Sequence, residues 1–161
     1  MRVITLPSHV ISSSFGDVFR EEGNKAFLER GECKKEYLST LRNLVTISLA
    51  PFLLFWYFSP KIFPIIFGIE WENAGILAQN MAPMFFFQFI SAPLSNMYII
   101  AGKNRYDLIF NIIIFFVGVL SFYVGIKIYK DLSDTLFLYS LCYSAIYAFN
   151  LVITYSFSRG R

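Results

Sequence analysis

Long apolar runs that carry no charged side chain alternate with short polar segments along most of this chain. There are four such runs, at residues 43–60, 73–102, 108–126 and 135–158. An α-helix rises about 1.5 Å per residue, so about 20 apolar residues span a hydrocarbon core of about 30 Å. Three of the runs reach or nearly reach that length, and the first reaches it if Lys61 extends its ammonium group toward the lipid headgroups. The pattern predicts an all-α, polytopic membrane protein with four transmembrane helices.

The residues before the first run have a different pattern. Between residues 15 and 37 charged side chains are frequent, and apolar ones are scattered among them. This favours a cytoplasmic, amphipathic helical hairpin near the membrane surface. The serines at 12–14 indicate a helix cap or a turn before it. We therefore divide the chain into a cytoplasmic segment, 1–42, and a four-helix transmembrane region, 43–161.

Prolines give the first two runs distinct features. The first run contains Pro51 and ends at Pro60, with Pro64 shortly after, which predicts a kink and an early stop of the helix. The second run contains Pro83 and Pro93. Because its roughly 28 residues exceed the bilayer thickness, we expect this helix to tilt or bend.

The third run carries small residues on one helix face. Gly118, Ser121 and Gly125 share that face, and Asn111 is expected to lie on it as well. Small side chains let a second helix approach closely. The spacing therefore predicts a helix–helix seam along this run.

The placement of the charged residues gives the chain an orientation in the membrane. Charged residues make up only 16% of the chain and hydrophobic ones 56%, whereas soluble domains carry about 25% charged residues. Of the 14 Lys and Arg residues, eleven lie in the first 42 residues, in the loop after the second run and in the tail; the other three are Lys61, Lys127 and Lys130. Because cytoplasmic loops are rich in Lys and Arg, we expect both termini in the cytoplasm.

Polar side chains recur at helical spacing inside two of the runs. The second run has Asn80, Met84, Gln88, Ser91, Ser95 and Tyr98, and the fourth has Ser140, Tyr143, Tyr147, Asn150 and Thr154. Steps of three or four place each set on one helix face. One interpretation is a hydrophilic path that hydrogen-bonds sugars, with candidate residues Asn80, Gln88, Ser91, Ser95, Tyr143, Tyr147 and Asn150. The other is hydrogen bonding between helices that only holds them together, which is the commoner role for any single residue of this kind.

Catalytic and metal-binding signatures are missing from the sequence. No Asp, Glu, Lys, Arg or His lies within the four runs, so there is no obvious proton relay or ion-coupling site in them. The single histidine, His9, has no carboxylate or cysteine close to it in sequence, and we expect Cys33 and Cys142 to be free thiols. There is no glycine-rich phosphate loop, zinc-type spacing or nucleophile elbow. We expect no enzyme activity, no cofactor or metal, and no nucleic-acid partner.

The connection between the first two runs resembles a known family. The residues that carry the resemblance are Phe67, Gly68, Glu70, Trp71, Ala74, Gly75, Pro83, Pro93, Leu94 and Ser95. In this spacing they resemble the polysaccharide-repeat-unit flippases of the multidrug/oligosaccharidyl-lipid/polysaccharide exporter superfamily. The upstream charged helix and the basic loop at 102–105 are similar to the corresponding parts of those proteins.

The same motif has a physical interpretation. Gly68 can end a helix in a left-handed conformation, and Asn73 can cap the helix that follows. Trp71 suits the outer membrane–water interface, where one edge of the ring is apolar and the N–H stays wet. We therefore interpret the motif as a turn between two helices in preference to a substrate contact.

The resemblance implies a transporter for lipid-linked sugars. Such proteins move undecaprenyl-diphosphate-linked oligosaccharide repeat units to the outer leaflet of the bacterial inner membrane, for O-antigen, capsule or exopolysaccharide assembly. The family has about 12 to 14 helices in two bundles, and this chain resembles the start of the second bundle, with residues 1–14 as the end of the preceding helix. The chain is then part of a flippase, whose partners are the bilayer, a lipid-linked oligosaccharide and the missing N-terminal half or another helical bundle.

Other functions stay open. The chain could be a small structural or assembly subunit of the membrane, or a truncated inactive fragment, in which the polar residues serve only helix packing. A membrane enzyme acting on lipid-linked sugars is disfavoured by the lack of acid–base residues in the runs.

Overall fold

The computed structural model describes residues 2–160, with side chains from residue 14 onward. Every element in this range is helical, as the sequence predicts. In chain order the elements are α1 (Arg2–Arg30), α2 (Lys34–Phe67), η1 (Ile69–Trp71), α3 (Glu72–Leu94), α4 (Met97–Ile100), α5 (Asn104–Tyr129) and α6 (Leu132–Ser158).

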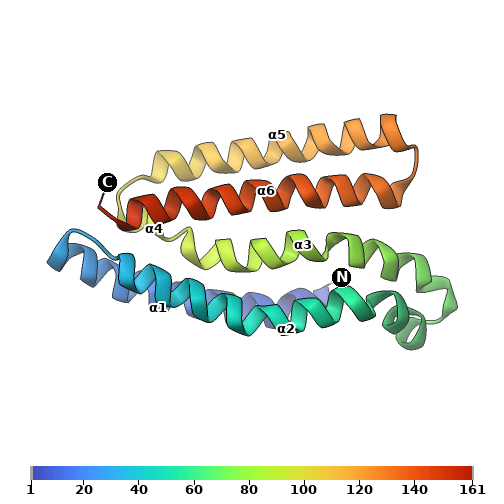
Figure 1. Cartoon of the computed structure of the whole chain (residues 1–161), viewed down its shortest axis with the longest axis horizontal. Helices are drawn as coiled ribbons and strands as arrows, with labels where there is room; N and C mark the ends of the chain where they lie inside the picture. The colour runs from blue at the N-terminus through green and yellow to red at the C-terminus, as the bar shows by residue number, and fades with distance from the viewer. Residues whose placement is uncertain (1, 161) are drawn as a thin grey trace.

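Four long helices lie side by side in a row. The order across the row is α2, α3, α6, α5, and successive helices along the chain run in opposite directions (Figure 1). α1 packs against α2 and α3, and the short α4 contacts α1, α6 and the start of α5. The α1–α2 turn, α4 and the end of α6 lie at one end of the row, on the left in Figure 1, and the α2–α3 and α5–α6 connections lie at the other.

Three of the described helices are long and apolar enough to cross a membrane. They are α2, α5 and α6. α3 has 23 residues but is not among them, because amide side chains such as Gln79, Asn80 and Gln88 interrupt its apolar sequence. Large apolar side chains stay exposed along these helices, for example Phe116 of α5, which is 65% exposed. Such a surface suits lipid and not water.

α2 differs from the helix that the sequence predicts. It begins at Lys34, well before the apolar run, and continues through Pro51, Pro60 and Pro64 to Phe67. The predicted early stop at Pro60 and Pro64 is therefore wrong. Proline in a membrane helix removes one backbone donor, but the remaining helical bonds and the neighbouring helices can hold the helix together.

The second apolar run is not one helix. α3 ends at Leu94, a turn follows, and α4 begins at Met97. The Asn96 amide nitrogen donates hydrogen bonds to the Gly16 carbonyl oxygen of α1 and to the Pro93 carbonyl oxygen, each at 3.1 Å. The side chain of Asn96 thus stabilises the turn and fixes it to α1.

α1 is a single helix from Arg2 to Arg30. The predicted cap or turn at residues 12–14 is wrong, because the backbone there is helical. The predicted helical hairpin exists: residues 31–33 connect α1 to α2, and Gly31 has a φ of 73°, which favours glycine. The side chain of His9 lies outside the described residues.

The small-residue seam is confirmed between α5 and α6. Gly118, Ser121 and Gly125 are the buried residues of α5. A methyl group on Gly118 would lie 2.3 Å from the Tyr143 hydroxyl oxygen, and one on Gly125 would lie 2.7 Å from a Thr135 methyl carbon. Asn111, seven positions before Gly118, lies on the same side of α5. It takes no part in the seam, because it is exposed and its amide nitrogen donates to the Asp107 carbonyl oxygen of its own helix.

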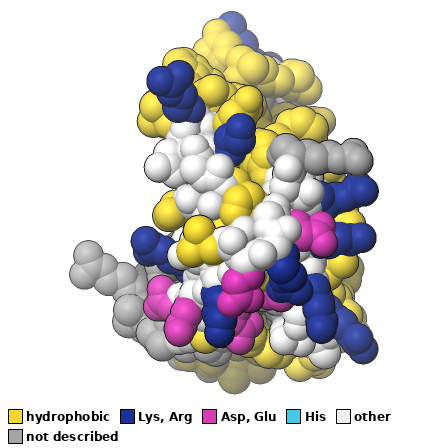
Figure 2. Space-filling view, turned by 90° about the vertical axis from the view of Figure 1, so that its left-hand side faces the viewer, with side chains coloured by type: hydrophobic (Ala, Val, Ile, Leu, Met, Phe, Trp, Pro, Cys, Tyr) yellow, Lys and Arg dark blue, Asp and Glu magenta, His cyan; other side chains and the backbone are white. Residues whose placement is uncertain are grey.

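The cations separate between the two ends of the row. Arg30, Lys34 and Lys35 surround the α1–α2 turn, and Lys103, Arg105 and Arg159 lie near it at the same end. Figure 2 looks onto this end and shows Lys and Arg side chains beside a smaller group of acidic ones. Lys61 and Lys127 belong to the other end, where each ammonium lies over a tyrosine ring, 5.7 and 4.9 Å from the ring centre. This separation agrees with the cation count from sequence.

Candidate functional site

A group of interacting buried polar side chains lies where α2, α3, α4 and α6 meet. α2 contributes Tyr37, which is fully buried although it follows three charged residues. Cys33, Tyr37, Thr40 and Leu44 recur every three or four residues, which puts them on one helix face, and all four are buried. The ring of Phe19 from α1 packs edge-on against Tyr37, with 5.9 Å between ring centres.

The Tyr37 hydroxyl connects α2 to α6. It donates to the Leu151 carbonyl oxygen at 2.9 Å and lies 2.8 Å from the Thr154 hydroxyl oxygen. Thr154 is itself fully buried, and its hydroxyl donates to the Asn150 carbonyl oxygen at 2.8 Å. Each of these groups would be costly to bury without a partner.

Asn150 connects α6 to α3 and α4. Its amide nitrogen donates to the Ser91 hydroxyl oxygen at 2.8 Å, and its amide oxygen accepts a hydrogen bond from the Tyr98 hydroxyl. All three side chains are no more than 1% exposed. We call Tyr37, Ser91, Tyr98, Asn150 and Thr154 the polar cluster.

Polar contacts between α3 and α6 continue toward the other end of the row. The Asn80 amide nitrogen donates to the Ser133 hydroxyl oxygen at 2.8 Å and to the Ser133 carbonyl oxygen at 3.1 Å. Between this pair and the polar cluster, the Met84 backbone N–H donates to the Ser140 hydroxyl oxygen at 3.3 Å. Hydrogen bonds therefore join α3 and α6 along most of their contact.

The predicted path residues divide among different surroundings. Ser91 and Asn150 contact each other inside the polar cluster, and Asn80 is bonded to Ser133. Tyr143 and Tyr147 face α5: Tyr143 stacks on Tyr139 at 4.4 Å and approaches Gly118, and Tyr147 packs against Phe110 at 6.0 Å. Gln88 is exposed, and the Ser95 hydroxyl donates to the Ala92 carbonyl oxygen of its own helix at 2.7 Å. The structure does not bring the seven residues together as one group.

Gln88 lies on the open face of the row. It is five residues before Pro93, and a helix turns about 100° per residue, so the two residues lie on nearly opposite sides of α3. A methyl group placed on Gly16 of α1 would lie 3.6 Å from the Pro93 Cα atom, which places Pro93 on the side covered by α1. Gln88 therefore belongs to the face of α3 away from α1.

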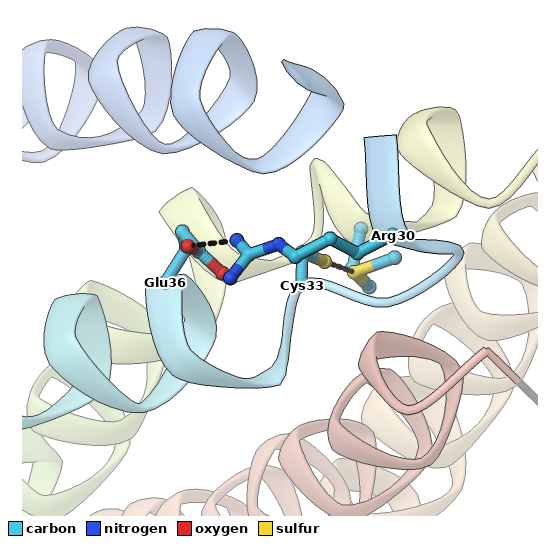
Figure 3. Close-up of polar contacts among 4 residues, drawn as sticks. Arg30, Cys33 and Glu36 are labelled. Carbon is cyan, nitrogen blue, oxygen red and sulfur yellow. Dashed lines mark hydrogen bonds and ion pairs between the residues drawn. The ribbon is translucent and has the colours of Figure 1, made fainter. Parts of the chain in front are cut away.

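The α1–α2 turn is fixed at several points. Arg30 and Glu36 form an ion pair across it, and the Cys33 thiol lies 3.4 Å from the Met97 sulfur atom of α4 (Figure 3). The Cys33 backbone N–H donates to the Ser158 carbonyl oxygen at the end of α6 at 2.9 Å. Burial raises the pKa of the Cys33 thiol from 9.0 to about 11, so this thiol is a poor nucleophile at neutral pH.

The family-like motif forms the turn between α2 and α3, as predicted. Gly68 ends α2 with a φ of 102° and a ψ of 161°, a combination that glycine adopts and the left-handed helical region does not include. The predicted cap by Asn73 is wrong, because α3 begins at Glu72 and Trp71 occupies its N-cap position. The Trp71 ring is half exposed and packs against Phe67 at 5.5 Å.

Gly75 explains why the motif needs a second glycine. A methyl group on Gly75 would lie 2.6 Å from the Ser59 carbonyl oxygen and 2.9 Å from the Pro60 Cα atom. Only glycine lets α3 approach the backbone of α2 this closely. Pro93 and Leu94 of the same motif are buried where α3 ends, whereas Ala74 and Pro83 are partly exposed. These contacts belong to helix packing.

No catalytic or metal-binding geometry stands out in the part of the chain that is described. Within it, no group of three or more His, Cys, Asp and Glu side chains could hold a metal ion. No protein-family model matches the chain, and neither a curated protein nor a solved structure matches it.

Sequence reasoning missed Tyr37 and Met97. Tyr37 stands in a charged stretch, which favoured a surface position, and Met97 was hidden in an apolar run. The spacing of Cys33, Tyr37, Leu44 and Ser48 is the signal that could have revealed one continuous buried face from the charged segment into the first run.

Proposed function

We propose that this chain is part of a membrane transporter that flips undecaprenyl-diphosphate-linked oligosaccharide repeat units across the bacterial inner membrane. In this proposal α2, α3, α5 and α6 all cross the bilayer, with both chain ends at the cytoplasmic face. The alternating directions of α2, α3, α5 and α6 along the chain, and the collection of cations at the end of the row where the C-terminus lies, support a cytoplasmic C-terminus. The motif at the α2–α3 turn supports the choice of family.

The observation that carries the proposal is the uncovered face of α3. Gln88 is exposed on a helix that has α2 on one side and α6 on the other. A polar amide facing hydrocarbon would be costly, so this face is expected to meet water or another polar surface. A hydrated cavity between this row and another bundle would let a charged diphosphate headgroup cross while its lipid tail remains in the bilayer.

Thiol accessibility tests this proposal. In a variant with Cys33→Ala and Cys142→Ala, single cysteines are placed at Gln88 and, as a matched control, at Phe116, which is exposed on α5. A membrane-impermeant, water-soluble thiol reagent applied to the chain in membranes should label the Gln88→Cys variant and leave the Phe116→Cys variant unlabelled. If neither cysteine reacts, the face of α3 meets lipid and the transport path is abandoned.

A structural or assembly subunit is the second candidate. The polar cluster favours it, because Ser91 and Tyr98 both bond to the Asn150 amide and so have the geometry of helix packing. Complementation separates the two functions. A bacterial strain lacking its repeat-unit exporter should regain surface polysaccharide when this chain is expressed with the first half of such an exporter. Failure with every such half, in cells where both proteins reach the membrane, would favour the subunit.

A further inference from the structure

A groove on the outward side of α2 has the composition of a phosphate site. It has a volume of about 560 Å³ and is lined by Leu38, Ser39, Arg42, Asn43, Thr46 and Ile47. They are three pairs of adjacent residues, and each pair follows the previous one by four positions. All six therefore occupy one helix face. The opposite face carries the buried residues Tyr37, Thr40 and Leu44. The groove is therefore open to whatever surrounds α2.

The position of the groove matches the edge of the hydrocarbon layer. Arg42 is the last charged residue before the uncharged run 43–60, so it marks the point where α2 changes from charged to apolar sequence. Interfacial cations at such points lie at the level of lipid phosphates. Further along the same face Ile47 and Leu53 are 46% and 55% exposed, which leaves an apolar surface for an acyl chain.

The charge in the groove lacks a partner. Among the described residues, the one ion pair is Arg30–Glu36, so Glu36 is already engaged and Arg42 is not neutralised by it. Lys35 lies seven positions before Arg42, two helical turns and about 10 Å away on the same face. This face of α2 therefore carries two cations, Lys35 and Arg42. None of the residues that line the groove is acidic.

We propose that this groove binds the phosphate headgroup of an anionic glycerophospholipid from the leaflet around the α1–α2 end. The planar guanidinium of Arg42 can donate two parallel hydrogen bonds to phosphate oxygens. The Ser39 hydroxyl and the Asn43 amide are further donors next to it. The Thr46 hydroxyl already donates to the Arg42 carbonyl oxygen at 2.8 Å, so it can only accept a bond from the headgroup.

In this proposal the lipid is a structural lipid that stays bound to α2, and it is not a transported substrate. The proposal requires that α2 lies in a membrane and does not depend on the proposed transport function. It predicts a preference for anionic over zwitterionic phospholipid that is located at Arg42 and is not spread over all the cations of this end.

Quenching of a reporter tryptophan by brominated lipids tests the site. The chain has two tryptophans, Trp56 and Trp71, and both are replaced by Phe. Ala50→Trp then places one reporter on the exposed side of α2, eight positions and about 12 Å beyond Arg42. The full chain is reconstituted in phosphatidylcholine vesicles with rising fractions of dibrominated phosphatidylglycerol or, in parallel, dibrominated phosphatidylcholine.

We expect the groove to bind phosphatidylglycerol about tenfold more strongly than phosphatidylcholine. Both lipids carry an anionic phosphodiester, but the quaternary ammonium of phosphatidylcholine cancels the net charge of its headgroup and is repelled by Arg42. Arg42→Gln should remove the preference, and Arg42→Lys, which keeps the charge and loses the planar fork, should retain part of it. Arg105→Gln, an exposed arginine at the same end, should leave it unchanged. Circular dichroism checks that each variant keeps its helix content.

Three outcomes would overturn the proposal. Equal quenching by the two brominated lipids in the parent chain would mean that there is no selective site. An equal loss in the Arg42→Gln and Arg105→Gln variants would reduce the preference to general attraction by positive charge. Relief of quenching by a few mole percent of unbrominated polyprenyl phosphate, with no relief by unbrominated phosphatidylglycerol, would assign the groove to a carrier lipid.

Discussion

Asn150 is the residue whose removal should destabilise the fold most clearly through hydrogen bonding alone. Its amide group bonds to Ser91 and Tyr98, and all three side chains are buried. Asn150→Ala breaks two interhelical hydrogen bonds and leaves both hydroxyl groups without this partner. At about 1–2 kcal/mol for each bond, the free energy of unfolding should fall by about 2–4 kcal/mol.

The assay is unfolding of the purified chain in mixed micelles with rising sodium dodecyl sulfate, followed by circular dichroism. Asn111→Ala serves as the control, because Asn111 is exposed and bonds only to its own helix. Tyr98→Phe removes one of the two bonds and should cost about half as much. The double variant should cost less than the sum of the single variants, because both remove the same bond.

One result would refute this reasoning. If Asn150→Ala unfolds at the same detergent fraction as Asn111→Ala, the polar cluster does not stabilise the packing of α6 against α3 and α4. The two interpretations of the cluster also separate here. A residue that lines a transport path lowers transport without lowering stability, whereas a packing residue lowers stability first.

Two further predictions follow from close contacts and burial. Gly75→Ala should lower the free energy of unfolding by about 2–3 kcal/mol, because the new methyl group meets the rigid backbone at Ser59. Gly118→Ala should lower it less, since the flexible end of the Tyr143 side chain can move. The same detergent titration measures both variants. For Cys33, whose pKa is raised to about 11 in the fold, alkylation of the folded chain should stay slow until the pH nears 11. The folded state holds the proton more tightly than the unfolded state, so stability should be unaffected below pH 9 and should fall between pH 9 and 11; rapid alkylation of the folded chain at pH 8 would contradict this.

The parts of the fold that follow from periodicity could be predicted from the sequence. α5 and α6 correspond closely to the third and fourth apolar runs, and the seam at Gly118 and Gly125 follows from their spacing. Small residues seven positions apart on an apolar helix favour the close approach of a neighbouring helix. Gly68 ends α2 as expected, because a positive φ at this point requires glycine.

The remainder depends on which helices become neighbours. Asn150 and Tyr98 both lie on predicted polar faces, but their contact exists because α6 packs beside α3 and α4, and periodicity carries no information about that order. Tyr37 was missed since its charged neighbours in sequence obscured a buried helix face. The helix continues through Pro60 and Pro64, although proline breaks most helices in water. In a membrane protein the neighbouring helices hold the chain in place and weaken this effect.

The prolines of α2 give the two ends of this helix different mechanical properties. Pro60 and Pro64 supply no amide hydrogen, so the carbonyl groups of Trp56 and Pro60 receive no bond from the residue four positions later. Bending α2 there breaks fewer backbone bonds than bending it at a turn that contains no proline. The opposite end is anchored through Tyr37 to α6. The close contact of α3 at Gly75 with the backbone at Ser59 and Pro60 therefore braces the part of α2 that lacks these bonds.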